Sequence, residues 1–123
     1  MPGNTAPAAP HIRTYETAGK TVVELLGEID IAAVDHVGAE LDTATDRPEL
    51  RLVIDLGSVD FMDCVGLGML CRARRRVEDR GGHLTLVCPH PLIRKMLRVA
   101  GLWQVFTLTD TLDEALGSRE AAT

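Results

Sequence analysis

The residue types that could do chemistry gather in one segment, after the apolar run Leu52–Leu56. Asp63 and Cys64 come directly before a stretch with helical spacing, and Gly66 and Gly68 fall in its first two turns. The N-terminus of a helix presents unpaired backbone N–H groups and a partial positive charge, which stabilise an anion there. We therefore interpret Asp63 as the helix N-cap and the glycines as positions where another backbone can come close.

This segment admits three interpretations. It fits a capped helix packed tightly on a sheet, with no further role. Thiols at helix N-termini ionise and oxidise readily, so Cys64 is also a candidate redox switch. The simpler alternative for Cys64 is that cysteine is a small residue that packs where serine would.

The other cysteines and histidines form no metal or catalytic pattern. Cys88 and His90, even with His83 and Cys71, lack the paired C-x-x-C spacing of zinc sites. The G-L-G at Gly66–Gly68 is too short for a phosphate-binding loop. No Ser or Cys stands with a His and an acid in a catalytic order. We expect no enzymatic activity, no metal and no cofactor.

The helix after Cys64 also carries basic residues, namely Arg72, Arg74, Arg75 and Arg76. They could bind an acidic partner or a nucleotide. The neighbouring Glu78 and Asp79 and the acidic net charge favour a solvated side of the helix that faces a partner.

Short apolar runs and helical spacings predict the elements that position these residues. Strands are expected at 11–15, 21–26, 52–56, 83–87 and 105–108, and helices after Asp30, over 65–79, over 91–100 and from 111 onwards. Asp30 is the expected N-cap of the first helix, and Thr111 and Glu114 have capping-box spacing for the last. Strands that alternate with helices predict an α/β fold with a mostly parallel sheet.

The composition limits the number of domains and the classes of partner and compartment that the chain fits. The 123 residues suffice for one domain, and 46% of them are hydrophobic, although only 3% are aromatic. The net charge of −5 argues against nucleic-acid binding. No apolar run is long enough for a membrane span, no export signal is present, and three unpaired cysteines fit a reducing cytoplasm. Residues 1–10 are expected to be a disordered leader and 118–123 a flexible tail.

Three sequence blocks together form a pattern found in a known family: GEID at Gly27–Asp30, VIDLGSVDFMDCVGLGML at Val53–Leu70, and RVAGLWQVFTLTDTLDEAL at Arg98–Leu116. In this order and spacing they resemble the STAS domain family, and within it the bacterial anti-sigma factor antagonists (anti-anti-sigma factors). The resemblance implies a STAS domain over residues 11–117, with a mixed sheet of four or five strands and about four helices packed on it.

The resemblance also implies an activity and a switch. Such proteins bind a kinase-type, ATP-binding anti-sigma factor and so release its sigma factor. That kinase inactivates them by phosphorylating a serine or threonine in a D-S-x-G or D-T-x-G block. By position, the aspartate here is Asp63, the glycine is Gly66, and the phosphoacceptor position is Cys64. Val65 occupies a position that is commonly Ser or Thr in relatives. Asp30 matches the acidic residue of the family's G-E-L-D block, which lies near the phosphorylation loop.

Cys64 departs from the family pattern because it has no hydroxyl to accept a phosphoryl group. Ser58, six residues upstream, is expected in a loop and is not a candidate acceptor. The chain is therefore expected to bind constitutively or to be regulated elsewhere.

The predicted partner surface is the segment Phe61–Gly68 with Asp30 beside it, and Met62, Leu67 and Met69 are expected to form its apolar rim. The residues assigned to partner binding are Asp30, Met62, Asp63, Cys64, Val65, Gly66, Leu67 and Gly68. Two alternatives stay open: an accessory subunit of a signalling or transport complex, and a thiol or ligand sensor. Homodimerisation is also left open.

Overall fold

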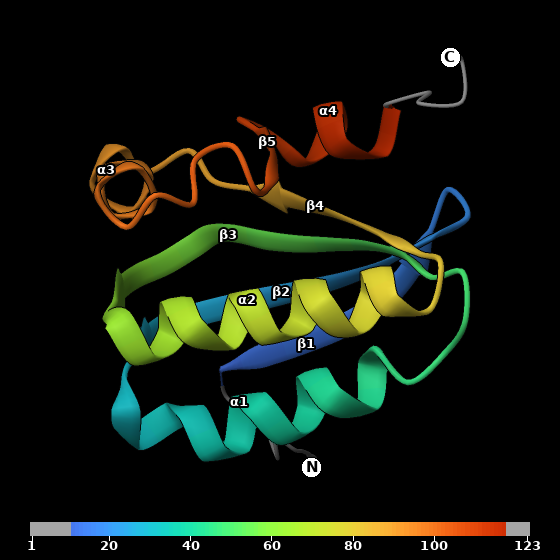
Figure 1. Cartoon of the computed structure of the whole chain (residues 1–123), viewed down its shortest axis with the longest axis horizontal. Helices are drawn as coiled ribbons and strands as arrows, with labels where there is room; N and C mark the ends of the chain where they lie inside the picture. Colours follow the sequence, from blue (N-terminus) through green and yellow to red (C-terminus); the bar gives the residue numbers. More distant parts are fainter. Residues whose placement is uncertain (1–10, 118–123) are drawn as a thin grey trace, which may run out of the picture.

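A computed structural model describes residues 11–117, which form one five-stranded sheet and four helices (Figure 1). In chain order the elements are β1 (Ile12–Thr17), β2 (Lys20–Ile29), α1 (Ile31–Ala44), β3 (Arg51–Met62), α2 (Cys64–Asp79), β4 (His83–Val87), α3 (Pro91–Val99), β5 (Thr107–Thr109) and α4 (Leu112–Gly117). The predicted α/β class and element order are confirmed. The predicted leader and tail lie outside the described residues.

The strands lie in the sheet in their order along the chain. β1 and β2 form an antiparallel hairpin, and β2, β3, β4 and β5 are parallel neighbours. Parallel neighbours need a crossover connection, which α1, α2 and α3 supply. All three of these helices therefore begin at the edge of the sheet where the parallel strands end (Figure 1).

Each face of the sheet has its own apolar layer. The larger layer packs the sheet against α1, α2 and α3, and includes Leu25, Ile54, Leu70, Leu86 and Leu97. The smaller layer consists of Val22, Val53 and Val87 against Ala115 of α4 on the other face. Alternate residues of a strand point to opposite faces, so Val53 and Ile54 enter different layers. Within residues 11–117, no helix combines the length and apolar character that crossing a membrane requires.

The third strand is longer than the sequence predicts. The apolar run ends at Leu56, yet β3 continues through Met62 and keeps pairing with β2. The pairing shifts register between Glu24 and Leu26, and again between Gly27 and Glu28. Such bulges hold extra residues in one strand without ending the ladder. They bring Met62 opposite Ile29, at the start of both helices that follow.

This extension corrects one expectation. Ser58 lies within β3 and not in a loop, and its hydroxyl donates a hydrogen bond to Glu24 Oε2 at 3.3 Å. The last strand is also shorter than predicted, because it begins at Thr107. The Val105 amide instead donates to the Leu102 carbonyl in the turn before it.

Candidate functional site: the end of the sheet where α1, α2 and α3 begin

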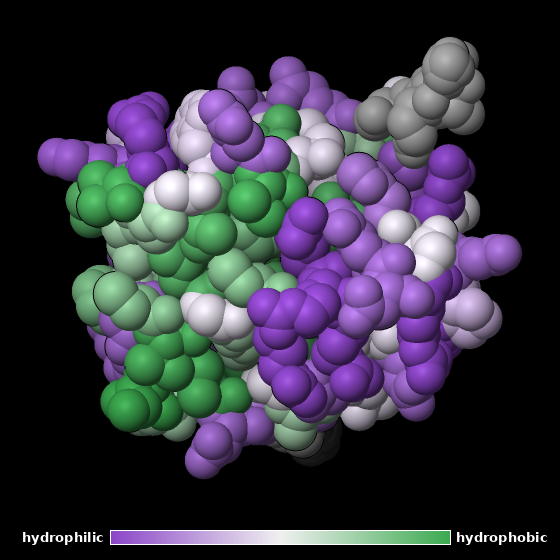
Figure 2. Space-filling model, viewed as in Figure 1, coloured by the Kyte–Doolittle hydropathy of each residue, from purple (hydrophilic) through white to green (hydrophobic). Residues whose placement is uncertain are grey.

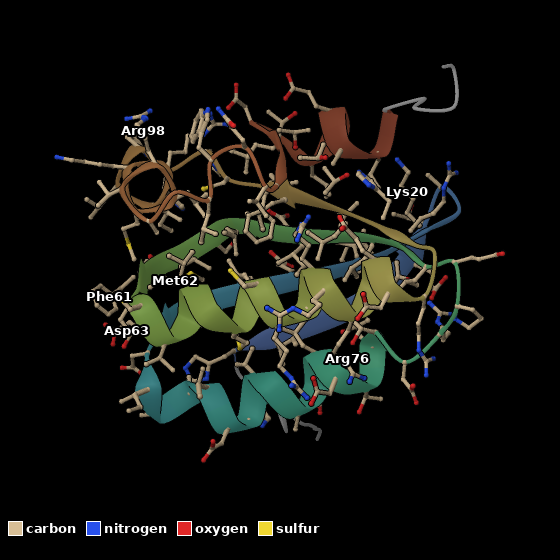
Figure 3. All side chains as sticks on the ribbon, in the orientation of Figure 1. Lys20, Phe61, Met62, Asp63, Arg76 and Arg98 are labelled. Atoms are coloured by element: carbon tan, nitrogen blue, oxygen red, sulfur yellow. The ribbon has the colours of Figure 1, made fainter. Side chains whose placement is uncertain are left out.

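The residues predicted for partner binding lie together at one end of the molecule. Figure 3 labels Phe61, Met62 and Asp63 where β3 passes into α2, and Lys20 at the opposite end. In open α/β sheets ligands usually bind outside the carboxyl ends of the strands. The fold therefore presents this segment where an α/β sheet most often carries its function.

Asp63 is the N-cap of α2, as predicted. Its Oδ1 accepts a hydrogen bond from the Gly66 amide at 3.0 Å, and its carbonyl accepts from the Leu67 amide at 3.0 Å. Through the first of these bonds, the Asp63 carboxylate caps the first turn of the helix. The side chain is half-buried and holds the start of α2 in place.

Asp30 plays the same part for α1. Its Oδ1 accepts from the amides of Ala32 at 3.0 Å and Ala33 at 3.2 Å. The two capped helix starts are linked through the backbone, because the Asp63 amide donates to the Ile29 carbonyl at 3.4 Å. The structure thus brings together two aspartates that are 33 positions apart in the sequence.

Cys64 is the first residue of α2 and is exposed to solvent. Val65 beside it is 41% exposed, and Gly68 lies one turn further on the surface. No residue from Val59 to Leu70 carries a hydroxyl. Cys64 is therefore the accessible nucleophile at this helix start, and a serine there would be equally accessible.

The prediction that Met62, Leu67 and Met69 form an exposed apolar rim around this surface is wrong. Met62 is 3% exposed, Leu67 6% and Met69 8%, and all three belong to the core. They face inward because the first turn of α2 packs on the ends of β2 and β3. The exposed large apolar residues of this segment are instead Phe61, at 49%, and Val65, at 41%.

The two glycines at the start of α2 differ in their surroundings. A Cβ added to Gly66 would lie 2.9 Å from the Ile29 carbonyl oxygen and 2.8 Å from Met62 Cγ. The space that Gly66 leaves is therefore filled by this chain itself, which corrects the expectation that a partner uses it. A Cβ added to Gly68 would meet nothing within 4 Å, so Gly68 is open to a partner.

Three of the four arginines of α2 are engaged within the chain. Arg72 donates to both carboxylate oxygens of Asp42, each at 3.1 Å, and Arg76 donates to the Asp42 carbonyl at 3.1 Å. Arg74 donates to the Val105 carbonyl at 3.0 Å. These bonds connect α2 to α1 and to the turn before β5, so Arg72, Arg74 and Arg76 have bonding partners within the chain, although the Arg72 side chain stays 59% exposed. Figure 3 shows Arg76 directed toward α1.

Sequence reasoning missed the contribution of α3 to this end of the molecule. Leu92 is 68% exposed and Val99 79%, whereas the buried residues of α3 are Ile93 and Leu97. The signal was available, because a helix with one buried face needs a single apolar stripe. Two further large apolar residues on the same short helix indicate a second contact.

The remaining cysteines and histidines do not assemble into a site. Burial raises the pKa of the Cys88 thiol, which lies at the end of β4 with its side chain in the core. Among residues 11–117, no three His, Cys, Asp or Glu side chains come close enough together to hold a metal ion.

Comparison with known proteins agrees with this architecture. A family model described as the STAS domain matches residues 10–115, and the chain belongs to that family. The expected STAS fold is confirmed. An anti-sigma F factor antagonist of Paenibacillus polymyxa is 28% identical over 103 residues, which cover 83% of this chain and 88% of that protein.

One further relative and one solved structure are similar to this chain over most of its length. The anti-sigma-F factor antagonist RsfB of Mycobacterium tuberculosis is 30% identical over 115 residues, 91% of each chain. The solved structure of the Bacillus cell fate determinant SpoIIAA in its phosphorylated form is 27% identical, with a TM-score of 0.67, and the match covers 85% of this chain and 96% of that one.

Proposed function

We propose that this chain is an anti-sigma factor antagonist that binds a kinase-type anti-sigma factor and releases the sigma factor it holds. The observation that carries the proposal is the start of α2, where Cys64 and Val65 stand exposed beside the Asp63 cap. Relatives that this chain matches over most of their length are named anti-sigma factor antagonists, which supports the same role here.

The proposed contact surface consists of the exposed part of the predicted segment, namely Phe61, Cys64, Val65 and Gly68. Asp30 and Asp63 lie beside it as half-buried caps, and Met62, Gly66 and Leu67 support it from below. A partner that approaches this surface meets two helix N-termini and apolar side chains. Both features favour a protein interface centred on Cys64.

We further propose that Cys64 occupies the position of the family's phosphoacceptor. Phosphorylation of a hydroxyl there would add about −1.5 to −2 charges at the centre of the interface. The Cys64 thiol has no hydroxyl oxygen to accept a phosphoryl group. The chain would therefore stay active when a serine-containing relative is switched off by phosphorylation. A cytoplasmic location follows from the proposed partner.

The test begins with recovery of the partner from the native cytoplasm and its identification. The purified partner is then titrated with wild-type protein and with Cys64→Glu, which places a negative charge at the proposed centre. Cys64→Glu should weaken binding at least tenfold, about 1.4 kcal/mol. The melting temperature should change little, because the helix dipole tolerates an acidic side chain in the first turn.

Arg75→Ala is the matched control, because it makes the same change of −1 in net charge. Arg75 is exposed on α2 and lies about 16 Å further along the helix axis. Equal binding by wild type and Cys64→Glu would place the interface elsewhere. Recovery of a transport complex in place of an anti-sigma factor would instead support the accessory-subunit alternative.

A further inference from the structure

The exposed surface around Cys64 is too small to hold a partner by itself. Stable protein interfaces bury about 800 Å² and 20–30 residues on each side. The segment Phe61–Gly68 offers four exposed residues. The carboxylates of Asp63 within it and of Asp30 beside it accept the hydrogen bonds that cap α2 and α1. A partner centred on Cys64 must therefore also contact what lies beside it.

A groove continues directly from Cys64 toward α3. It has a volume of about 360 Å³ and runs between the start of α2 and the side of α3, lined by Cys64, Leu67, Leu92, Lys95, Met96, Val99 and Ala100. A second depression of about 260 Å³ shares Leu92 and Met96 with the groove and is also lined by Phe61. Figure 2 shows the corresponding apolar area at the end of the molecule where α2 and α3 begin.

The groove is apolar at its floor and positive at its rim. Leu92 and Val99 are among the most exposed large apolar residues of the described chain. Helix α3 carries Arg94, Lys95 and Arg98 and no acidic residue, whereas the chain as a whole has a net charge of −5. This local excess of cations stands out against an acidic protein and selects negatively charged partners.

The three cations of α3 differ in how far the chain itself uses them. Arg94 and Arg98 lie over the Trp103 ring, with their guanidinium carbons 5.5 and 4.9 Å from its centre. Arg94 also donates to the Cys88 carbonyl at 2.6 Å and forms an ion pair with Asp110 at 2.5 Å, so its charge is already partnered. Among residues 11–117, no side chain forms a hydrogen bond or ion pair with Lys95. A free ammonium on the rim of an apolar groove fits a carboxylate that enters with an apolar side chain.

We infer that the groove between α2 and α3 is the second half of the partner surface, and that it takes an acidic amphipathic segment of the anti-sigma factor. The apolar face of that segment packs on Leu92 and Val99, and its carboxylates face Lys95 and Arg98. This inference rests on the proposed function, and it adds to it the chemistry of the partner. With contacts on both sides of Cys64, a charge at that residue would lie at the centre of the whole interface.

The inference is tested by titrating the purified anti-sigma factor with Lys95→Glu, Lys95→Met and Val99→Asp. Val99 and Lys95 are exposed, so the melting temperature should not change. Lys95→Glu should weaken binding about tenfold in 50 mM salt, and the loss should shrink in 300 mM salt because screening weakens the repulsion. Lys95→Met, which keeps the apolar stem, should lose less. Val99→Asp should lose about tenfold at both salt concentrations, since it places an unpaired charge against an apolar face.

Arg75→Glu is the control for Lys95→Glu, since both variants change the net charge by −2 and both residues are exposed. Unchanged or tighter binding by Lys95→Glu would overturn an acidic partner segment, and unchanged binding by Val99→Asp would overturn docking in the groove. If Cys64→Glu weakens binding and neither α3 variant does, the proposed function stands and this inference fails. If the wild-type chain binds no anti-sigma factor, both fail.

Discussion

Gly66 and Ile29 approach so closely that a Cβ on Gly66 would lie 2.9 Å from the Ile29 carbonyl oxygen. The same carbonyl accepts a hydrogen bond from the Asp63 amide at 3.4 Å. The end of β2 is thereby fixed against the first turn of α2, one residue before the Asp30 cap. The geometry around Cys64 depends on this contact, which only glycine permits without a shift of the backbone.

Substitution of Gly66 should therefore cost stability where substitution of Gly68 does not. We expect Gly66→Ala to lower the free energy of unfolding by about 1–3 kcal/mol, because the methyl group must displace the Ile29 carbonyl and Met62. Gly68→Ala, in open space on the same helix, should be neutral or stabilise by up to about 1 kcal/mol. Urea denaturation of both variants measures this difference. Equal stabilities would show that the start of α2 can relax away from β2.

The start of α2 should not be phosphorylated in the wild-type chain. Incubation of the wild-type chain with the anti-sigma kinase and ATP should give no phosphate between Val59 and Leu70, because that segment has no hydroxyl. Cys64→Ser should acquire phosphate, since the side chain keeps its size and its exposed place on α2. Gly68→Ser, one turn along, is the control and should stay unmodified. Mass spectrometry of intact and digested protein reads the outcome. Phosphate on Cys64, or at high stoichiometry on a distant hydroxyl, would contradict the assignment.

The pairing of Asp42 with Arg72 predicts a dependence of stability on pH. The hydrogen bonds from Arg72, with the charges of Arg72 and Arg76, hold the pKa of Asp42 below its usual range. A carboxylate with a lowered folded-state pKa adds stability above its unfolded pKa of about 3.9, and that stability is lost as the pH falls through the folded value. Because both side chains are largely exposed, solvent screening keeps the contribution of the pair to stability at pH 7 small.

Asp42→Asn should remove this contribution and flatten the fall in stability as the pH drops from about 5 toward 3. The measurement is the free energy of unfolding in urea at several pH values. Asp35→Asn, an exposed carboxylate on the same helix, should leave the profile nearly unchanged. A profile of Asp42→Asn that parallels wild type would mean that the ion pair adds nothing in solution.

The three thiols should react at different rates with a disulfide reagent such as DTNB. Cys64 is exposed, Cys71 is half-buried and Cys88 is buried, and burial raises the pKa of the Cys88 thiol. We expect a fast phase from Cys64 and no reaction of Cys88 until the protein unfolds, because both access and the thiolate are lacking there. Cys64→Ser should abolish the fast phase.

The same thiol tests the redox alternative. Mild peroxide that oxidises Cys64 should leave partner binding unchanged if Cys64 only fills the position of a serine. Weaker binding after oxidation, restored by a thiol reductant and absent in Cys64→Ser, would establish Cys64 as a redox switch.

Local signals in the sequence were enough to predict the order of elements and the two helix caps. Asp30 and Asp63 each precede an apolar helical stripe, and a short carboxylate at that position bonds only to amides two or three residues away. The contact is local, so the sequence pattern determines it. The strand at Leu52–Leu56 was likewise visible because burial on both faces requires a continuous apolar run.

The full length of β3 could not be predicted from the sequence pattern. Gly57, Ser58 and Asp60 interrupt the apolar pattern, and the segment stays a strand because the bulged pairing with β2 supplies its hydrogen bonds. The outward role expected for Met62 and Leu67 failed for a related reason. Which side of a helix start faces solvent depends on how close the neighbouring strand ends come, and here they cover both side chains.

The sequence by itself determined the fold class, the helix caps and the absence of a hydroxyl at the start of α2, because each depends on residues close together in the chain. The tertiary structure alone decided that Gly66 serves internal packing, that Arg72 and Arg76 fasten α1 to α2, and that Lys95 and Val99 border a groove that ends at Cys64. These last relationships join residues about 30 or more positions apart. Their proximity follows from the crossover connections of a parallel sheet, which bring distant helix starts to one edge.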